Sequence, residues 1–117
     1  MKVIIELGHR SSAIEQAKRD LAVSQAGASA DYHLIFESAR TLFSELTPAR
    51  IDALEYLRVH GPMSIYALAK ALHRNYSNVH TDVEKILEHG LAEKDGNNRI
   101  SAPWDAIEIR LAQAKVA

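Results

Sequence analysis

The stretch "NYSNVHTDVEKILEHGL", residues 75–91, places short hydrogen-bonding side chains on one face of an expected helix. An apolar stripe at helical spacing, formed by Val79, Val83, Ile86, Leu87 and Leu91, marks the opposite face. The polar face of the first two turns presents Tyr76, Ser77, Asn78, His80 and Thr81. A helix face that meets only water more often carries Glu and Lys. The pattern therefore predicts a face that reads a hydrogen-bonding surface.

Base edges in a DNA groove are such a surface. Asn78 can pair bidentately with adenine, while Ser77 and Thr81 can bond to either base type. The methyl group of Thr81 can also meet the methyl group of thymine. The major groove is about 12 Å wide and admits one α-helix. We therefore expect residues 75–89 to form a recognition helix.

Phosphate contacts are expected from the segments around this helix. No Asp or Glu occurs from residue 56 to residue 81, although the formal charge of the whole chain is −1. The cations there are Arg58, Lys70 and Arg74, and a phosphate backbone could approach them without repulsion. Chance clustering in a neutral protein is the alternative. The residues expected to contact DNA are Ser64, Lys70, Arg74, Asn75, Tyr76, Ser77, Asn78, His80, Thr81, Lys85, Asn97, Asn98 and Arg99.

The elements that must position these residues carry clear helix signals. Thr47 and Pro48 begin a helix that ends at Gly61. Ser64 caps a short second helix, and Asn75 caps the third, which Gly90 stops. Segments 91–94 and 99–102, joined by the turn "DGNN", are typical of a β-hairpin. Three helices followed by a two-stranded hairpin is the order of a winged helix-turn-helix, in which Asn97, Asn98 and Arg99 form the wing tip.

The remaining segments predict an extension at the N-terminal side. Residues 2–8 alternate like a strand, and Ser12 with Glu15 forms a capping box for a helix that ends near Gly27. Residues 26–31 are typical of a linker, and residues 32–38 of a second strand or an extended arm. Ser38 is expected to cap a short helix through Leu46. Residues 104–112 fit a strand or a helix, and Ile109 favours the strand. The predicted fold is α+β and mainly α, with a strand-helix-strand arm over 1–37 and a winged helix-turn-helix domain with a C-terminal strand over 38–117.

Residues 36–111 also resemble a family of small prokaryotic winged-helix regulators. The segments "LTPARIDAL", "RNYSNVHTDVEKILEHGL" and "APWDAIEI" carry the resemblance. The family is loosely MarR-like, and its members are often antitoxins of the TumA type, encoded beside a toxin. The resemblance implies sequence-specific DNA binding, repression of the chain's own operon and neutralisation of a toxin.

Other functions find little support in the sequence. The chain has no cysteine, and none of its six histidines forms an i, i+4 pair, so we expect no metal site and no cofactor. No nucleophile elbow, carboxylate pair or glycine-rich phosphate loop occurs, so we do not expect an enzyme. The apolar run in "MKVIIELGHR" is too short for a signal peptide or a membrane span, which indicates a cytoplasmic protein.

One residue of the expected recognition helix, Asp82, is acidic and would be unfavourable close to DNA phosphates. Asp82 could accept a hydrogen bond from cytosine, but a carboxylate that faces phosphates would cost affinity. We therefore favour a salt bridge that braces the fold, with Arg74 or Lys85 as the partner.

We expect a homodimeric regulator that binds double-stranded DNA and represses transcription. The alternative is an antitoxin or adaptor whose main partner is a protein, such as a cognate toxin, bound by the N-terminal arm. The segments "KVIIEL" and "WDAIEIRL" invite pairing with each other or with a second chain. A dimer held by them would space its two recognition helices by about 34 Å, one turn of DNA. Pairing within one chain would instead leave a monomer.

Overall fold

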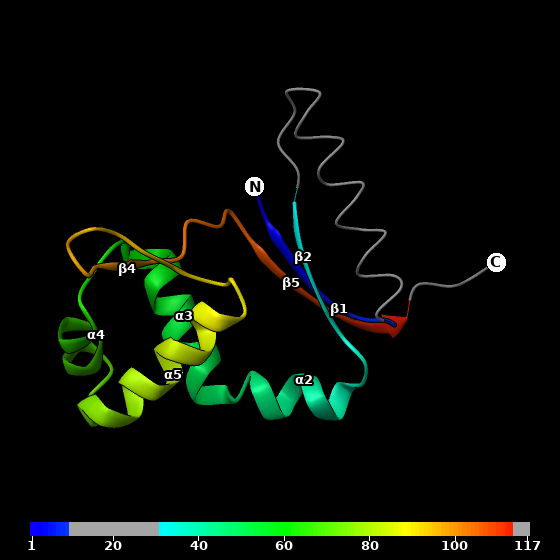
Figure 1. Cartoon of the computed structure of the whole chain (residues 1–117), viewed down its shortest axis with the longest axis horizontal. Coiled ribbons are helices and arrows are strands. Elements are labelled where there is room, and N and C mark those ends of the chain that lie inside the picture. The colour runs from blue at the N-terminus through cyan, green and yellow to red at the C-terminus, as the bar shows by residue number, and fades with distance from the viewer. Residues whose placement is uncertain (10–30, 114–117) are drawn as a thin grey trace. The chain divides into compact units, whose positions relative to one another are not determined.

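The computed structural model describes residues 1–9 and 31–113, which form four helices and five strands in an α+β arrangement (Figure 1). Contacts divide the chain into two units. The sheet unit comprises Met1–Ser44 and Trp104–Ala117, and the helical unit comprises Glu45–Pro103. The helix expected over 12–27, with its Ser12–Glu15 capping box, and most of the expected linker over 26–31 lie outside the described residues.

The sheet unit contains three parallel strands in the order β2-β1-β5 (Figure 1). Strand β1 spans Val3–Leu7, β2 spans Tyr32–Phe36 and β5 spans Ile107–Gln113. Both strands expected near the N-terminal side are confirmed, and the ambiguous segment after Trp104 is a strand. Val3 of β1 is in register with Tyr32 on one side and with Ile107 on the other. The segments "KVIIEL" and "WDAIEIRL" therefore pair within one chain.

The central position of β1 explains its burial. Val3, Ile4 and Ile5 are all buried, so both faces of the strand are covered. The alternating pattern places Ile4 on the face opposite Val3 and Ile5, and that face is covered as well. The central strand of a parallel sheet is covered on both faces and reads as a continuous apolar run.

The boundary between the units differs from the one expected at residues 37 and 38. Helix α2, Ala39–Glu45, belongs to the sheet unit up to Ser44, and β5 joins the sheet unit because it pairs with β1. Trp104 is buried and stacks on Tyr32, with ring centroids 5.8 Å apart.

The helical unit contains the three helices and the hairpin in the expected order. Helix α3 spans Pro48–His60, α4 spans Ile65–Ala71 and α5 spans Tyr76–Glu88. The side chains of Thr47, Ser64 and Asn75 accept hydrogen bonds from the first turns of these helices, which confirms all three predicted caps. The hairpin strands are shorter than expected, with β3 at Glu93–Lys94 and β4 at Ile100–Ser101.

The connection between α4 and α5 is closed by backbone hydrogen bonds. The N–H of Arg74 donates to Ala69 O at 3.0 Å and the N–H of His73 donates to Lys70 O at 3.2 Å, the pair of bonds of a Schellman motif. His73 therefore adopts a left-handed conformation with φ 54°. Helix α5 ends in the same motif at Gly90, where φ is 72°, as the sequence predicted.

A compact apolar core holds the helical unit together. Its fully buried large side chains are Leu46, Leu57, Leu68, Val79, Val83, Ile86, Leu91 and Ile100. These residues come from all three helices and the hairpin, so the orientation of α5 is fixed by packing on one whole face. None of the helices in the described part of the chain has the length and apolar character needed to cross a membrane.

Candidate nucleic-acid interface

The first two turns of α5 present the polar face that the sequence predicted. Val79, Asp82 and Val83 are buried, and the exposed side chains on the other side are Tyr76, Ser77, Asn78 and Thr81, with His80 partly exposed. The described residues form no hydrogen bond with the side-chain amide of Asn78. Its donor and acceptor are therefore directed to solvent and available to a ligand.

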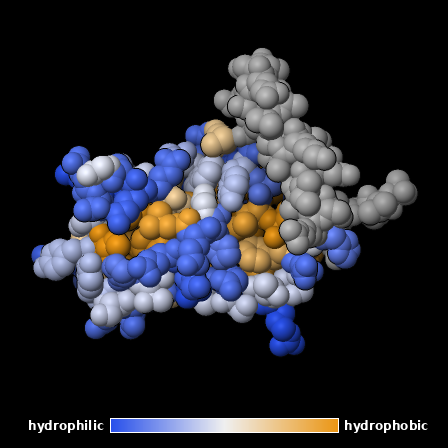
Figure 2. Space-filling view, in the orientation of Figure 1, coloured by the Kyte–Doolittle hydropathy of each residue, from blue (hydrophilic) through white to orange (hydrophobic). Residues whose placement is uncertain are grey.

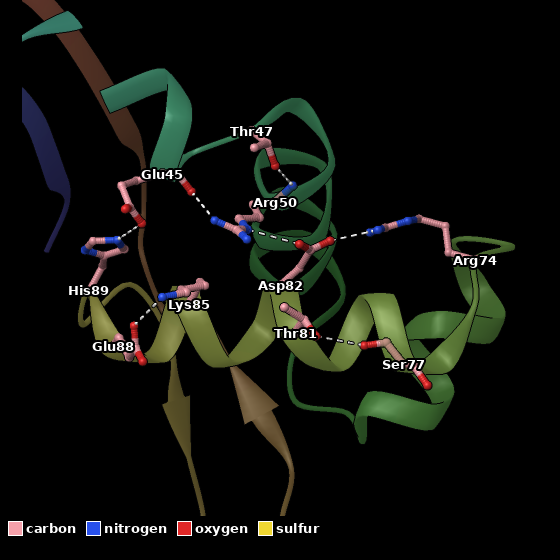
Figure 3. A network of polar contacts seen from close by, with 10 residues as sticks. All are labelled: Glu45, Thr47, Arg50, Arg74, Ser77, Thr81, Asp82, Lys85, Glu88 and His89. Atoms are coloured by element: carbon pink, nitrogen blue, oxygen red, sulfur yellow. Dashed lines mark hydrogen bonds and ion pairs between the residues drawn. The ribbon is translucent and has the colours of Figure 1, made fainter. Parts of the chain in front are cut away.

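Two other polar side chains of this helix are already engaged. The Oδ1 of Asn75 accepts from the N–H groups of Ser77 and Asn78, so Asn75 acts as the helix cap. The hydroxyl of Thr81 donates to Ser77 O at 3.1 Å (Figure 3). Thr81 can therefore offer a ligand its oxygen lone pairs and its methyl group, but not its proton.

The second half of α5 is acidic. Glu84 and Glu88 have side chains 61% and 64% exposed. Lys85, expected at the interface, lies 3.3 Å from Glu88 (Figure 3). Exposed carboxylates repel phosphates. Only the N-terminal half of α5 is suited to approach a nucleic acid, which leaves Lys85 at the margin of this surface.

Asp82 is the centre of an ion network inside the helical unit (Figure 3). Its carboxylate accepts from Arg50 Nε at 3.0 Å and from Arg74 Nη2 at 2.8 Å. Arg50 comes from the first turn of α3 and also donates to Glu45 O at 2.9 Å. The predicted bridge to Arg74 is confirmed and the alternative bridge to Lys85 is wrong. The network ties α5 to the start of α3 and to the turn before α5.

This network changes what Arg74 can do. Its guanidinium is committed to Asp82 through one nitrogen, and the other terminal nitrogen is buried without a hydrogen-bond partner among the described residues. Arg74 therefore first positions α5. The phosphate contact expected of Arg74 would therefore act only through its positive charge close to the start of the helix.

The far end of α5 is held by a second polar contact. His89 Nε2 donates to Glu45 Oε2 at 3.2 Å (Figure 3). This hydrogen bond lowers the pKa of Glu45 below its ordinary value of 4.5. The segment from Glu45 to Arg50 therefore contacts α5 and its end at two places: Arg50 bonds to Asp82, and Glu45 bonds to His89.

The hairpin tip is ordered by one carboxylate. Asp95 Oδ1 accepts from the N–H groups of Asn97 at 2.8 Å and Arg99 at 3.0 Å. The two backbone hydrogen bonds lower the pKa of Asp95. Asn98 adopts a left-handed conformation, with φ 60°. The side chains of Asn97, Asn98 and Arg99 are all exposed at this tip, as expected for a contact loop.

Three segments that are distant in the sequence line one surface hollow of about 290 Å³. The start of α4, the start of α5 and the hairpin contribute its walls, which consist of Ser64, Ile65, Tyr66, Tyr76, His80, Lys94 and Asn98. The rings of Tyr76 and His80 lie against each other, with centroids 5.8 Å apart. Tyr66 is 68% exposed at the edge of the hollow. The arrangement combines aromatic, amide, imidazole and ammonium groups on one surface.

Three residues of this hollow, Ile65, Tyr66 and Lys94, were not among those expected at the interface. Ile65 and Tyr66 lie in the short second helix, of which only the cap Ser64 and Lys70 were expected to contact DNA, and Lys94 was assigned to the hairpin strand alone. The position of Lys94, directly before the "DGNN" turn, was the available signal.

The positive charge of the helical unit is modest. Lys70, Lys94 and Arg99 are exposed and form no ion pair within residues 1–9 and 31–113, whereas Arg58 is paired with Glu55 at 2.7 Å. These described ranges also contain no group of three or more His, Cys, Asp or Glu that could hold a metal ion.

Comparison with known families agrees with the extent of the helical unit. The model of the HVO_A0114 family matches residues 45–109, more than half of the chain, and the chain belongs to this family. The match begins at the first residue of the helical unit. Neither the curated proteins nor the solved structures contain a significant match to the chain.

Proposed function

We propose that this member of the HVO_A0114 family is a regulator of transcription that binds double-stranded DNA through a winged helix-turn-helix. In this proposal α4 and α5 are the helix-turn-helix, α5 is the recognition helix and the β3–β4 hairpin is the wing. The Schellman turn between α4 and α5 supports the assignment, as does the antiparallel bridge between Met63 and Ile100, which adds a third segment to the hairpin.

The observation that carries the proposal is the hollow between the starts of the two helices and the hairpin. It brings the hairpin residues Lys94 and Asn98 beside Tyr76 and His80 of α5. Base contacts specify sequence and phosphate contacts fix position, and this surface offers groups for both. A recognition helix reads base edges mainly with its N-terminal residues, and the N-terminal half of α5 exposes no acidic side chain, since Asp82 is buried.

The charge distribution sets the expected strength of binding. Three exposed cations without ion partners, Lys70, Lys94 and Arg99, permit few phosphate contacts for each chain. Each neutralised phosphate contributes roughly −0.9 to the slope of log K against log salt concentration. We therefore expect a shallow slope of about −3 for each chain, with hydrogen bonds to bases supplying much of the specificity.

Binding of the purified chain to the DNA upstream of its own gene tests the proposal. Fluorescence anisotropy with this duplex and with a shuffled duplex, each titrated with salt, separates specific from non-specific binding. We expect tighter binding to the upstream duplex at every salt concentration. In vitro selection from random duplexes would find the site if it lies elsewhere.

Equal, weak binding to all duplexes, with no enrichment in the selection, would contradict sequence-specific recognition. In that case the protein-binding alternative, an antitoxin or adaptor, is the better account. The neighbouring gene gives an independent indication, because a small toxin-like reading frame beside this one would point to a protein partner.

A further inference from the structure

The second edge of β5 has no strand paired with it among the described residues, although this strand is the most exposed apolar segment of the sheet unit. Strand β5 reads Ile-Glu-Ile-Arg-Leu-Ala-Gln from Ile107 to Gln113. Ile109 is 41% and Leu111 is 49% exposed. Figure 2 shows apolar surface over the part of the sheet that Figure 1 labels β1 and β5. An exposed edge with apolar side chains invites another strand.

The backbone of β5 determines which residues can bond at this edge. Val3 N–H donates to Ala106 O at 3.1 Å, so the polar backbone groups of Ala106 point to β1. Successive residues of a strand point their N–H and C=O groups to opposite sides, and those of Ala106, Glu108 and Arg110 share one side. The N–H and C=O groups of Ile107 and Ile109 therefore point to the open edge. Beyond Arg110 the register with β1 shifts, so that Leu7 is in register with Gln113 and the strand is irregular at Leu111 and Ala112.

The order of side chains in β5 makes the strand complementary to itself. If two copies of β5 pair antiparallel about Ile109, each Ile109 faces its counterpart on the other copy. Each Glu108 then faces an Arg110 of the other copy. Neighbouring registers are poorer, because pairing about Glu108 opposes two carboxylates and pairing about Arg110 opposes two guanidiniums.

Registers centred between two residues are excluded by the backbone. They would place an outward-pointing residue such as Ile109 opposite an inward-pointing one such as Arg110, and no ladder of hydrogen bonds could form. In the register about Ile109, the outward backbone groups of Ile109 on each copy meet their counterparts. The Glu108–Arg110 pairs occupy the positions without backbone bonds, where opposite side chains are closest.

The charged residues already have the required arrangement within one chain. Arg110 Nη2 lies 2.7 Å from Glu108 Oε2, and Lys2 Nζ lies 2.9 Å from Glu108 Oε1. These contacts lower the pKa of Glu108 and keep it ionised. Glu108 and Arg110 remain about half exposed on one face, at 37% and 50%. Pairing of two strands would join their charges into one alternating cluster.

We propose that the open edge of β5 is a homodimer interface, in which two copies of β5 pair antiparallel about Ile109. The occupant of this edge is therefore a second copy of the chain, related by a two-fold axis that passes beside Ile109. The other edge strand is less suited to this role. Antiparallel pairing of β2 about Leu34 would oppose His33 to Ile35 and has no charge complementarity.

Sedimentation velocity without DNA tests this interface independently of the proposed function. We expect the parent chain to form a reversible dimer at micromolar concentration. Arg110→Glu and Glu108→Arg should each weaken the dimer by about tenfold or more, because each variant opposes like charges across the two-fold axis. The double variant Glu108→Arg with Arg110→Glu should restore the dimer. Arg40→Glu changes the net charge by the same amount on α2 and should leave the dimer intact.

The register has its own test, because the chain contains no cysteine. Ile109→Cys places one thiol in each chain, and in the expected register the two thiols lie opposite each other. A short bifunctional thiol reagent should then link two chains. In Ile107→Cys the two thiols lie four positions apart along the ladder, about 14 Å, and should not be linked.

A parent chain that stays monomeric over the micromolar range would overturn the proposal. So would a folded double variant that stays monomeric, or equal linking of the two cysteine variants. Circular dichroism of each variant identifies a loss of folding, and the recovery expected of the double variant cannot arise from misfolding.

Discussion

Replacing Asp82 with Asn removes the negative charge that two arginines share while it preserves the size of the side chain. In the parent chain the carboxylate lies 3.0 Å from Arg50 Nε and 2.8 Å from Arg74 Nη2. After the replacement, Arg50 keeps its bond to Glu45 O, but Arg74 loses the carboxylate oxygen that accepts its hydrogen bond. An uncompensated cation then remains partly buried at the start of α5.

The structure sets the size of this effect. Removal of one partner from a buried ion pair costs about 3–5 kcal/mol. The Asp82 side chain is only 11% exposed, but that of Arg74 is 28% exposed, so water partly solvates the cation that is left. We therefore expect the free energy of unfolding to fall by about 2–4 kcal/mol. For a unit of this size the melting temperature should fall by about 10–25 °C.

Urea unfolding followed by far-ultraviolet circular dichroism measures this change, because α3, α4 and α5 supply most of the helix in the described chain. The fluorescence of Trp104, the single tryptophan, reports the sheet unit separately. Glu84→Gln is a matched control on the same helix. Its side chain is 61% exposed and 3.4 Å from His80, so its loss should cost less than about 0.5 kcal/mol.

An Asp82→Asn variant as stable as the Glu84→Gln variant would refute the reasoning. That result would mean that the cost of desolvating three charged groups cancels their attraction. The core packing of α5 would then be sufficient to fix the helix, and the ion network would have no net effect on stability.

Three further predictions concern recognition, charge and pH. Asn78→Ala and Thr81→Ala should each weaken binding to the specific duplex by about 1–3 kcal/mol and leave non-specific binding unchanged, since both side chains are exposed on the first turns of α5. Arg99→Ala should weaken binding to all duplexes alike and reduce the salt slope by about one. Glu45→Gln should make stability less sensitive to acid. The hydrogen bond from His89 lowers the pKa of Glu45, so the folded state binds fewer protons than the unfolded state between the lowered pKa and 4.5. This stabilisation is complete above pH 4.5 and is lost as the pH falls through the lowered pKa, which urea unfolding at a series of pH values measures.

Each of these predictions has a control in the chain. Arg58→Ala removes a cation already paired with Glu55 and should leave the salt slope unchanged. Parent-like binding by both the Asn78 and the Thr81 variants would show that another face of α5 meets the DNA. An acid transition in Glu45→Gln identical to that of the parent would show that other carboxylates govern acid unfolding.

Local features of the fold were predictable because they depend on neighbouring residues. Thr47, Ser64 and Asn75 begin their helices and Gly90 ends α5, since caps and left-handed turns act over one helical turn. His73 was not predicted to adopt the left-handed conformation that ends α4. A Gly at that position would have been recognisable, whereas a His gives no such signal.

Contacts between distant residues were harder to predict. The salt bridge of Asp82 was predicted with a residue eight positions away, but its second partner, Arg50, is 32 positions away and comes from another helix. No local pattern indicates such a partner. The exposed polar face of α5 was predicted because helical periodicity alone separates it from the core, whereas Lys94 joined the hollow only through the path of the hairpin.

The insertion of the helical unit between β2 and β5 has a consequence for synthesis of the chain. Val3 pairs with Ile107, so the sheet cannot be completed until the ribosome has delivered all three helices and the hairpin. The residues of the helical unit are continuous in the sequence, so this unit can fold first. Until β5 is synthesised, the edge of β1 that pairs with β5 has no partner strand. During that interval an apolar strand is exposed to other nascent chains. Slow translation after residue 103 would lengthen this interval, and rapid delivery of β5 protects the chain from aggregation.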